Sequence, residues 1–118
     1  MRIFALASFL SALILAGCAT TDTTFYWGNY SETLYDLKKS PDEKTLKAHS
    51  DQLLLIITEA PNKNRRVPPG VYAEYGYILL KQGKEAEGMG YLDKEMDLYP
   101  ESDVFIKRIK SEYARGKR

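Results

Sequence analysis

The stretch PGVYAEYGYILLKQGKEAEGMGYLDKEMDLYP, residues 69–100, decides the fold of this chain. Apolar and small residues recur there at the three- and four-residue spacing of a helix, first before and then after Gln82-Gly83-Lys84. They are Tyr72, Tyr75, Gly76 and Leu79 in the first half, and Gly88, Leu92, Met96 and Tyr99 in the second. The pattern predicts two helices folded back on each other across a turn and ended by Pro100. Such a hairpin buries one face against its own partner and leaves another face that needs neighbours.

This hairpin resembles one unit of the 34-residue tetratricopeptide repeat. Gly76 and Gly88 stand where small residues let the two helices of a unit approach closely. Glu95 departs from the pattern, because a small apolar residue is usual at that position. The expected fold is therefore all-α, with tetratricopeptide-like antiparallel helical hairpins and about five helices, but not a full repeat array. The pattern positions filled without a gap are Tyr72, Tyr75, Gly76, Leu79, Gly88, Leu92 and Pro100.

Two helices are predicted before the hairpin. The first starts at a cap provided by Asn29 or Ser31 and ends near Lys39, with the bend before it at Gly28. Its apolar stripe consists of Tyr30, Leu34 and Leu37.

The second helix is predicted to start at Ser40-Pro41-Asp42-Glu43, with Ser40 as the cap and Pro41 at the first helical position. It is expected to end near Glu59, because Pro61 follows. Its buried stripe is expected to contain Leu46, Leu53, Ile57 and, as a partly buried imidazole, His49.

A last helix begins at Glu101-Ser102-Asp103 and is expected to cover the open face of the hairpin. Its apolar positions are Phe105 or Ile106, then Ile109 and Tyr113.

The start of the chain has the pattern of a bacterial lipoprotein. Met1-Arg2 is followed by an almost wholly apolar run from Ile3 to Ala16, too short to span a bilayer as a helix, which needs about 20 residues. Leu15-Ala16-Gly17-Cys18 then matches a lipobox, whose cysteine accepts a diacylglycerol. We expect a signal peptide over 1–17, a lipidated tether over 18–25 and the helical domain over 26–118. An ordinary cysteine behind an uncleaved signal is the alternative.

Lipidation of Cys18 would use the only cysteine of the chain, which leaves no disulfide, thiol chemistry or cysteine metal site. Several acyl chains, palmitate among them, would give stable membrane attachment. Ala19 follows the cysteine in place of Asp, and resemblance to sorted lipoproteins then implies the outer membrane, facing the periplasm.

The near balance of basic and acidic side chains argues against a nucleic-acid partner. The chain has 17 basic and 16 acidic side chains, and loss of Arg2 with the signal would make the numbers equal. Two local clusters remain, the loop with Lys63, Arg65 and Arg66 and the basic C-terminal tip. Each is either a solvated segment or a contact for an anion or a lipid headgroup.

Several short motifs resemble a family of small uncharacterised bacterial lipoproteins, over essentially the whole mature chain. They are Tyr26-Trp27-Gly28-Asn29-Tyr30, Leu34-Tyr35, Pro69-Gly70, Tyr75-Gly76 and Tyr99-Pro100-Glu101-Ser102. Members are typically encoded beside a lipoprotein similar to the curli secretion channel and a further small lipoprotein. The resemblance implies membership of an envelope assembly, and it implies no activity and no catalytic residue.

An interaction scaffold is the expected function, and no cofactor, metal or catalytic residue is expected. The sequence lacks a Cys-His or Ser-His-Asp set, a phosphate-binding glycine loop and a metal-ligand cluster. The alternative is a periplasmic module that binds peptidoglycan or a sugar. The partner contacts that we expect are Trp27, Tyr30, Ala73, Tyr77, Leu80 and Lys81.

Overall fold

The structure, a computed structural model, describes residues 24–118. In order, its helices are α2 (Tyr30–Lys39), α3 (Glu43–Asn62), α4 (Val71–Lys81), α5 (Glu85–Leu98), the short 3-10 helix η2 (Pro100–Ser102) and α6 (Asp103–Gly116). The described part contains five α-helices and no strand, so the predicted all-α fold is confirmed. The lipobox residues Leu15, Ala16, Gly17 and Cys18 lie outside the described residues.

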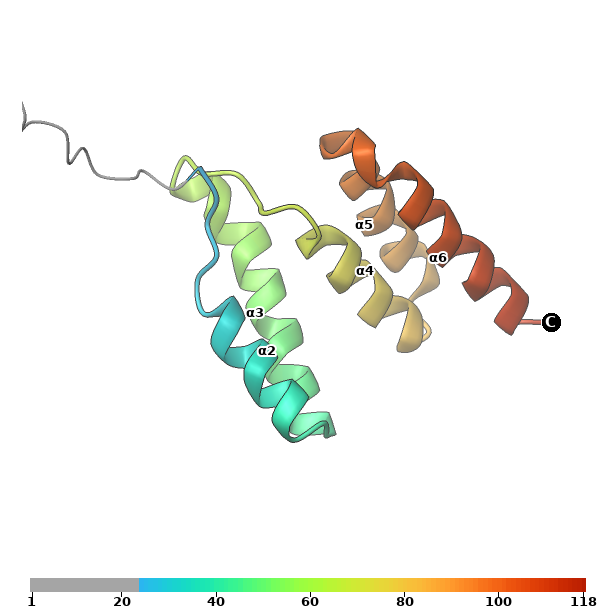
Figure 1. Cartoon of the computed structure of the whole chain (residues 1–118), viewed down its shortest axis with the longest axis horizontal. Helices are drawn as coiled ribbons and strands as arrows, with labels where there is room; N and C mark the ends of the chain where they lie inside the picture. Colours follow the sequence, from blue (N-terminus) through green and yellow to red (C-terminus); the bar gives the residue numbers. More distant parts are fainter. Residues whose placement is uncertain (1–23) are drawn as a thin grey trace, which may run out of the picture.

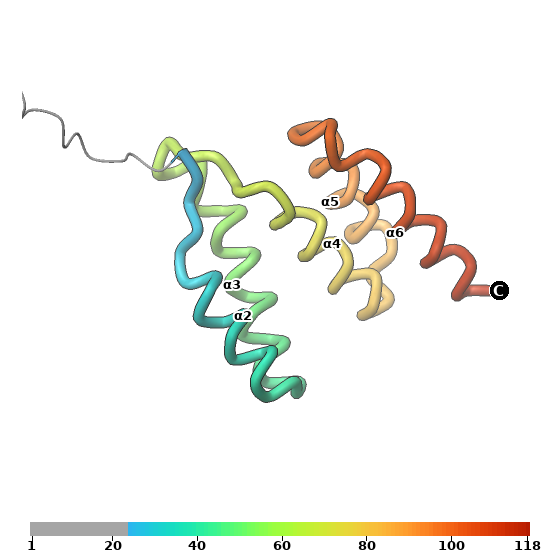
Figure 2. The backbone as a smooth tube through the Cα atoms, in the orientation of Figure 1, coloured from blue at the N-terminus to red at the C-terminus, as the bar shows by residue number. Residues whose placement is uncertain are grey.

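Two antiparallel hairpins and one further helix make up the domain (Figure 1). Helices α2 and α3 form the first hairpin, α4 and α5 form the second, and α6 packs against both helices of the second. Helix α4 lies in the middle, since it contacts α3 on one side and α5 and α6 on the other (Figure 2). No helix within residues 24–118 combines the length and apolar character that crossing a bilayer requires.

The second hairpin forms as its spacing predicts. Gly83 has φ of +78° in the turn, a conformation that glycine adopts without strain. A Cβ on Gly76 would lie 2.8 Å from the carbonyl oxygen of Gly88, and the reverse distance is the same. The two backbones therefore meet at these glycines, as expected. Of the predicted positions, Tyr75, Gly76, Leu79, Gly88, Leu92 and Tyr99 are buried and Tyr72 and Met96 are partly buried.

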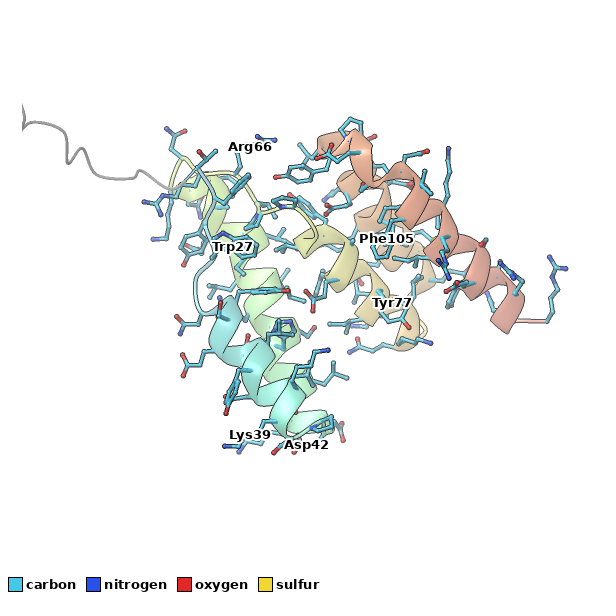
Figure 3. All side chains as sticks on the ribbon, in the orientation of Figure 1. Trp27, Lys39, Asp42, Arg66, Tyr77 and Phe105 are labelled. Atoms are coloured by element: carbon cyan, nitrogen blue, oxygen red, sulfur yellow. The ribbon has the colours of Figure 1, made fainter. Side chains whose placement is uncertain are left out.

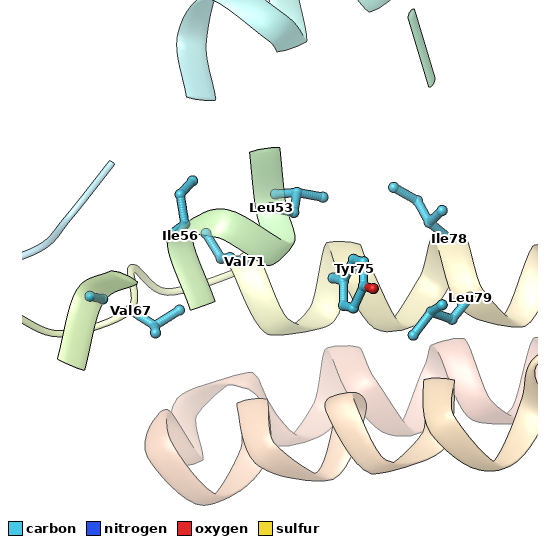
Figure 4. Close-up of a cluster of buried hydrophobic side chains, with 8 residues drawn as sticks. Leu53, Ile56, Val67, Val71, Tyr75, Ile78 and Leu79 are labelled. Carbon is cyan, nitrogen blue, oxygen red and sulfur yellow. The ribbon is translucent and has the colours of Figure 1, made fainter. Parts of the chain in front are cut away.

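Two cores lie on the two sides of α4. The larger contains Leu53 and Ile56 of α3 and Val71, Tyr75, Ile78 and Leu79 of α4 (Figure 4). The smaller contains Ala73 and Leu80 of α4, Leu92 of α5 and Ile106 of α6. The last helix thus covers the hairpin as predicted, with Ile106 inside and Phe105 59% exposed.

Helix α3 differs from its prediction at its start. It begins at Glu43, two residues after Pro41, because Asp42 and not Ser40 provides the cap. The Asp42 carboxylate accepts a hydrogen bond from the Thr45 backbone N–H at 2.8 Å, and the Thr45 hydroxyl oxygen accepts one from the Asp42 N–H at 3.1 Å. This reciprocal pair satisfies more backbone donors than a lone serine cap would.

The predicted end of α3 near Glu59 is also wrong, because the helix continues through Pro61 to Asn62. Asn64, with φ of +52°, then closes it in a left-handed conformation. The Arg65 N–H donates to the Ala60 carbonyl at 2.9 Å and the Asn64 N–H to that of Pro61 at 3.0 Å. These bonds satisfy the last carbonyls of a helix that proline alone does not stop.

The buried stripe of α3 is displaced from the predicted one. Leu46 is 37% exposed and Ile57 is half-buried, whereas Leu53 is buried as expected. His49, expected to be partly buried, is fully buried. The actual stripe is His49, Leu53, Ile56 and Ala60, because the face that meets α4 follows this register.

Candidate functional site

A groove runs between α4 and α6. It consists of two adjoining hollows of about 320 Å³ and 410 Å³, which share Tyr77, Ile109 and Glu112 as lining residues. The first hollow is also lined by Leu80, Lys81, Tyr113, Gly116 and Lys117. The second is also lined by Gly70, Ala73, Glu74 and Phe105. We call this surface the α4–α6 groove.

The groove has an apolar floor. Ala73 and Leu80 are 4% and 2% exposed, and both pack in the smaller core against Leu92 and Ile106. Ala73 lines the second hollow and Leu80 the first. A groove with such a floor binds through apolar contact area.

Aromatic rings stand above this floor. Tyr77 of α4 is 45% exposed and Phe105 of α6 is 59% exposed (Figure 3). Tyr113, which lies further along α6 toward its C-terminus, is partly buried. Rings that project from a fixed helix are typical anchors of protein interfaces, because they bury much area and lose little entropy.

The two ends of the groove differ in charge. Glu74 lies at the end near Phe105, and Lys81 and Lys117 lie at the other. The Lys81 ammonium is 5.3 Å from the centre of the Tyr77 ring, and that of Lys117 is 5.6 Å from the Tyr113 ring. Lys117 also pairs with Glu85, and this hydrogen bond raises the pKa of the Lys117 ammonium.

Glu74 connects the groove to the first hairpin. One of its carboxylate oxygens accepts a hydrogen bond from the Tyr30 hydroxyl at 2.8 Å, and the other lies 2.9 Å from Nε2 of His49. Nδ1 of the same ring is 2.8 Å from the Thr33 hydroxyl. Burial of Tyr30, followed by its bond to Glu74 and the carboxylate charge, raises the pKa of Tyr30 to about 12. We call Tyr30, Thr33, His49 and Glu74 the polar junction.

The hydrogen bonds of Glu95 explain why this residue departs from the repeat pattern. Helix α4 begins after Gly70, which has no side chain to cap it. The buried Glu95 carboxylate accepts hydrogen bonds from the backbone N–H groups of Gly70 at 2.7 Å and Ala73 at 3.3 Å. A carboxylate is favoured there by the positive end of the helix dipole, so α5 caps α4.

The structure brings together four of the six predicted contact residues. Ala73, Tyr77, Leu80 and Lys81 line the α4–α6 groove, the first and third as its floor and the others as exposed parts of its wall. Trp27 and Tyr30 lie outside it. Their rings are 5.2 Å apart where the chain enters α2, with Trp27 42% exposed and Tyr30 partly buried in the polar junction.

The wall that α6 contributes was not among the predicted contacts. Helical spacing identified Phe105, Ile109 and Tyr113 as apolar positions of the last helix, but not as neighbours of Tyr77. Within residues 24–118, no group of three or more His, Cys, Asp or Glu side chains is arranged to hold a metal ion.

Comparison with known proteins adds a family. Over 107 residues the chain is 26% identical to envelope glycoprotein H of equine herpesvirus 4 (strain 1942), a match that covers 86% of this chain and 12% of the glycoprotein. The chain thus spans about an eighth of that protein, and no solved structure matches it. A domain of unknown function (DUF4810) matches residues 24–109, which include both hairpins and the first half of α6. The chain therefore belongs to the DUF4810 family, in which no function is assigned to this domain.

Proposed function

We propose that this protein is a lipid-anchored scaffold or assembly factor of a bacterial envelope complex, and that the α4–α6 groove holds its partner. The observation that carries the proposal is the groove itself, which has an apolar floor, exposed rings and charged ends between two helices. The lipobox match at Leu15–Cys18 supports the anchor. The outer membrane, facing the periplasm, remains the proposed location.

The partner that fits this surface is an amphipathic helix of another protein. Apolar side chains of such a helix would bury Tyr77 and Phe105 and reach Ala73 and Leu80. A basic side chain near Glu74 and an acidic one near Lys81 would complement the ends of the groove and fix its orientation. The resemblance to small lipoproteins encoded beside a secretion-channel-like lipoprotein suggests that protein as the source of the helix.

Neighbouring residues of α6 provide a matched test. Phe105 lines the groove, whereas Val104, at 80% exposure, does not. Phe105→Asp and Val104→Asp each place one carboxylate on the exposed side of the same helix turn. We expect only Phe105→Asp to abolish co-purification of the partner with the intact lipoprotein from solubilised membranes.

A photoreactive amino acid at position 77 should identify that partner in intact cells. The control position is Tyr35, which is 62% exposed on α2 and lies outside the groove. A protein captured at 77 and not at 35 supports the scaffold. Equal capture at both positions contradicts a groove-specific partner. The wall-binding alternative would be favoured if the purified protein binds peptidoglycan and Phe105→Asp abolishes that binding.

A further inference from the structure

The end of the domain at which the chain enters combines aromatic and basic residues. Segment 25–27 is Phe-Tyr-Trp, of which Trp27 is exposed and the other two are partly buried. The loop between α3 and α4 carries the exposed side chains of Lys63, Arg65 and Arg66. We call these two segments together the basic aromatic end. Neither contributes to the α4–α6 groove.

Backbone hydrogen bonds join the two segments. The Arg66 N–H donates to the Thr24 carbonyl at 2.9 Å, and the Tyr26 N–H donates to the Arg66 carbonyl at 3.1 Å. Phe25 and Arg66 form a parallel bridge. The point at which the chain leaves for residue 18 is therefore fixed beside the basic loop.

Two cations of the loop, Lys63 and Arg66, lie over aromatic rings. The Lys63 ammonium is 5.4 Å from the centre of the Tyr26 ring, and the Arg66 guanidinium is 5.7 Å from that of Phe25 and 5.4 Å from that of Tyr99. Trp27, which follows Tyr26 along the chain, is 42% exposed. An exposed Trp ring near Lys and Arg side chains is the combination that favours the interface between water and lipid headgroups.

The length of the connection limits what this end can face. Five residues separate Cys18 from Thr24, the first described residue. At about 3.5 Å per residue the connection extends at most roughly 20 Å. A lipid on Cys18 thus keeps the basic aromatic end close to the bilayer, while the C-terminus of α6 lies at the opposite end of the domain (Figure 1).

We propose that the basic aromatic end lies against the headgroups of a bilayer that contains anionic phospholipids. The proposal rests on the lipid anchor of the proposed function, but not on the identity of any protein partner. Lys63 and Arg65 supply charge attraction, and Trp27 enters the interfacial layer. The domain then stands on this end and presents the α4–α6 groove away from the lipid.

Trp27 is the only tryptophan and reports on this contact directly. The intact lipidated protein is reconstituted into vesicles of phosphatidylethanolamine and phosphatidylglycerol, or of phosphatidylcholine alone. We expect Trp27 emission to shift to shorter wavelength in the anionic vesicles and to be quenched by lipids brominated high on the acyl chain. Lys63→Glu with Arg65→Glu should lower this quenching at least twofold, as should high salt.

The matched control reverses two charges at the other end of the domain. Arg115→Glu with Arg118→Glu changes the net charge equally and should leave the quenching unchanged, and circular dichroism verifies that each variant is folded. Lys63→Gln with Arg65→Gln replaces the first pair if reversal unfolds the protein, with a smaller loss expected.

Vesicle flotation separates failure of the anchor from failure of the contact. Protein that floats with the vesicles while Trp27 stays unquenched overturns the contact and leaves the anchor and the groove intact. Protein that does not float overturns both the anchor and the contact. If the control pair Arg115→Glu with Arg118→Glu loses as much quenching, positive charge at either end of the domain promotes the lipid contact. That result also overturns the assignment of the contact to the basic aromatic end.

Discussion

Helix α4 is joined to α5 and to the first hairpin by different physical means. On one side it meets α5 at Gly76 and Gly88, where the two backbones touch with no side chain between them. On the other side, besides apolar packing, it meets the first hairpin through the hydrogen bonds of Glu74 to Tyr30 and His49. The first contact is sensitive to any added atom, and the second is sensitive to the loss of one partner.

The glycine contact should show the largest effect. In Gly88→Ala the new Cβ would lie 2.8 Å from the Gly76 carbonyl oxygen and 2.9 Å from Leu80. The backbone oxygen cannot move without shifting α4, so we expect a loss of about 3 kcal/mol in the free energy of unfolding. Urea denaturation followed by circular dichroism measures it.

Gly90 is the matched control, two residues further along the same helix. A Cβ there has no atom within 4 Å. Gly90→Ala should stabilise the protein by about 0.5–1 kcal/mol, since alanine is the better helix former. If both substitutions stabilise the protein, the backbones are not in contact.

The α4–α5 contact also contains one polar component, Glu95. In Glu95→Ala the N–H groups of Gly70 and Ala73 lose their acceptor and a cavity forms, which we expect to cost about 2–3 kcal/mol. Glu95→Gln keeps the shape of the side chain and one acceptor oxygen, so the loss in the free energy of unfolding should be about half as large. Asp97→Asn, on the exposed side of α5, should change stability little, and an equal loss there would contradict the capping role.

These contacts differ in how far the sequence predicts them. The pairing of Gly76 with Gly88 follows from helical spacing along one hairpin, and so does burial of Leu79 and Leu92. Glu95 was only an exception to the pattern, because its role depends on a helix start 22 to 25 residues earlier.

The remaining errors have two physical origins, one local and one long-range. The two ends of α3 depend on competing caps, the Asp42–Thr45 pair and the left-handed Asn64, which local composition does not rank. The α6 wall of the groove depends on how a third helix docks on the hairpin. Spacing identifies the apolar positions of α6, such as Ile109, but not the residues that they face.

The polar junction should show a smaller effect than the glycine contact. In Glu74→Gln the amide oxygen can accept from Tyr30 or from His49 but the carboxylate charge is lost, so we expect a cost of about 1–2 kcal/mol. Glu87→Gln, an exposed position on α5, is the control and should be nearly neutral. Hydrogen exchange should show more frequent opening of α2 and α3 than of α5, and uniform opening would contradict a local junction.

The smallest effect is a pH dependence at Tyr30. Its pKa is about 12 in the folded protein and 10.0 for an unperturbed tyrosine, so between these values the unfolded chain loses a proton that the folded chain keeps. The stability from this difference is fully present below pH 10 and is lost as the pH rises toward 12. Other tyrosines titrate in the same range, so the measurement compares the slope of the unfolding free energy in the wild type with that in Tyr30→Phe.

The slope should be steeper in the wild type than in Tyr30→Phe, because only the wild type can lose the Tyr30 proton on unfolding. Tyr35→Phe removes a hydroxyl from an exposed site on the same helix without touching Glu74, and it should keep the wild-type slope. Equal slopes in the wild type and Tyr30→Phe would mean that neither burial nor the bond to Glu74 raises the pKa of Tyr30 in the folded protein. The first hairpin would then be attached to α4 by apolar packing and the His49–Glu74 contact, without a contribution from Tyr30, and the two sides of α4 would differ less than their geometry indicates.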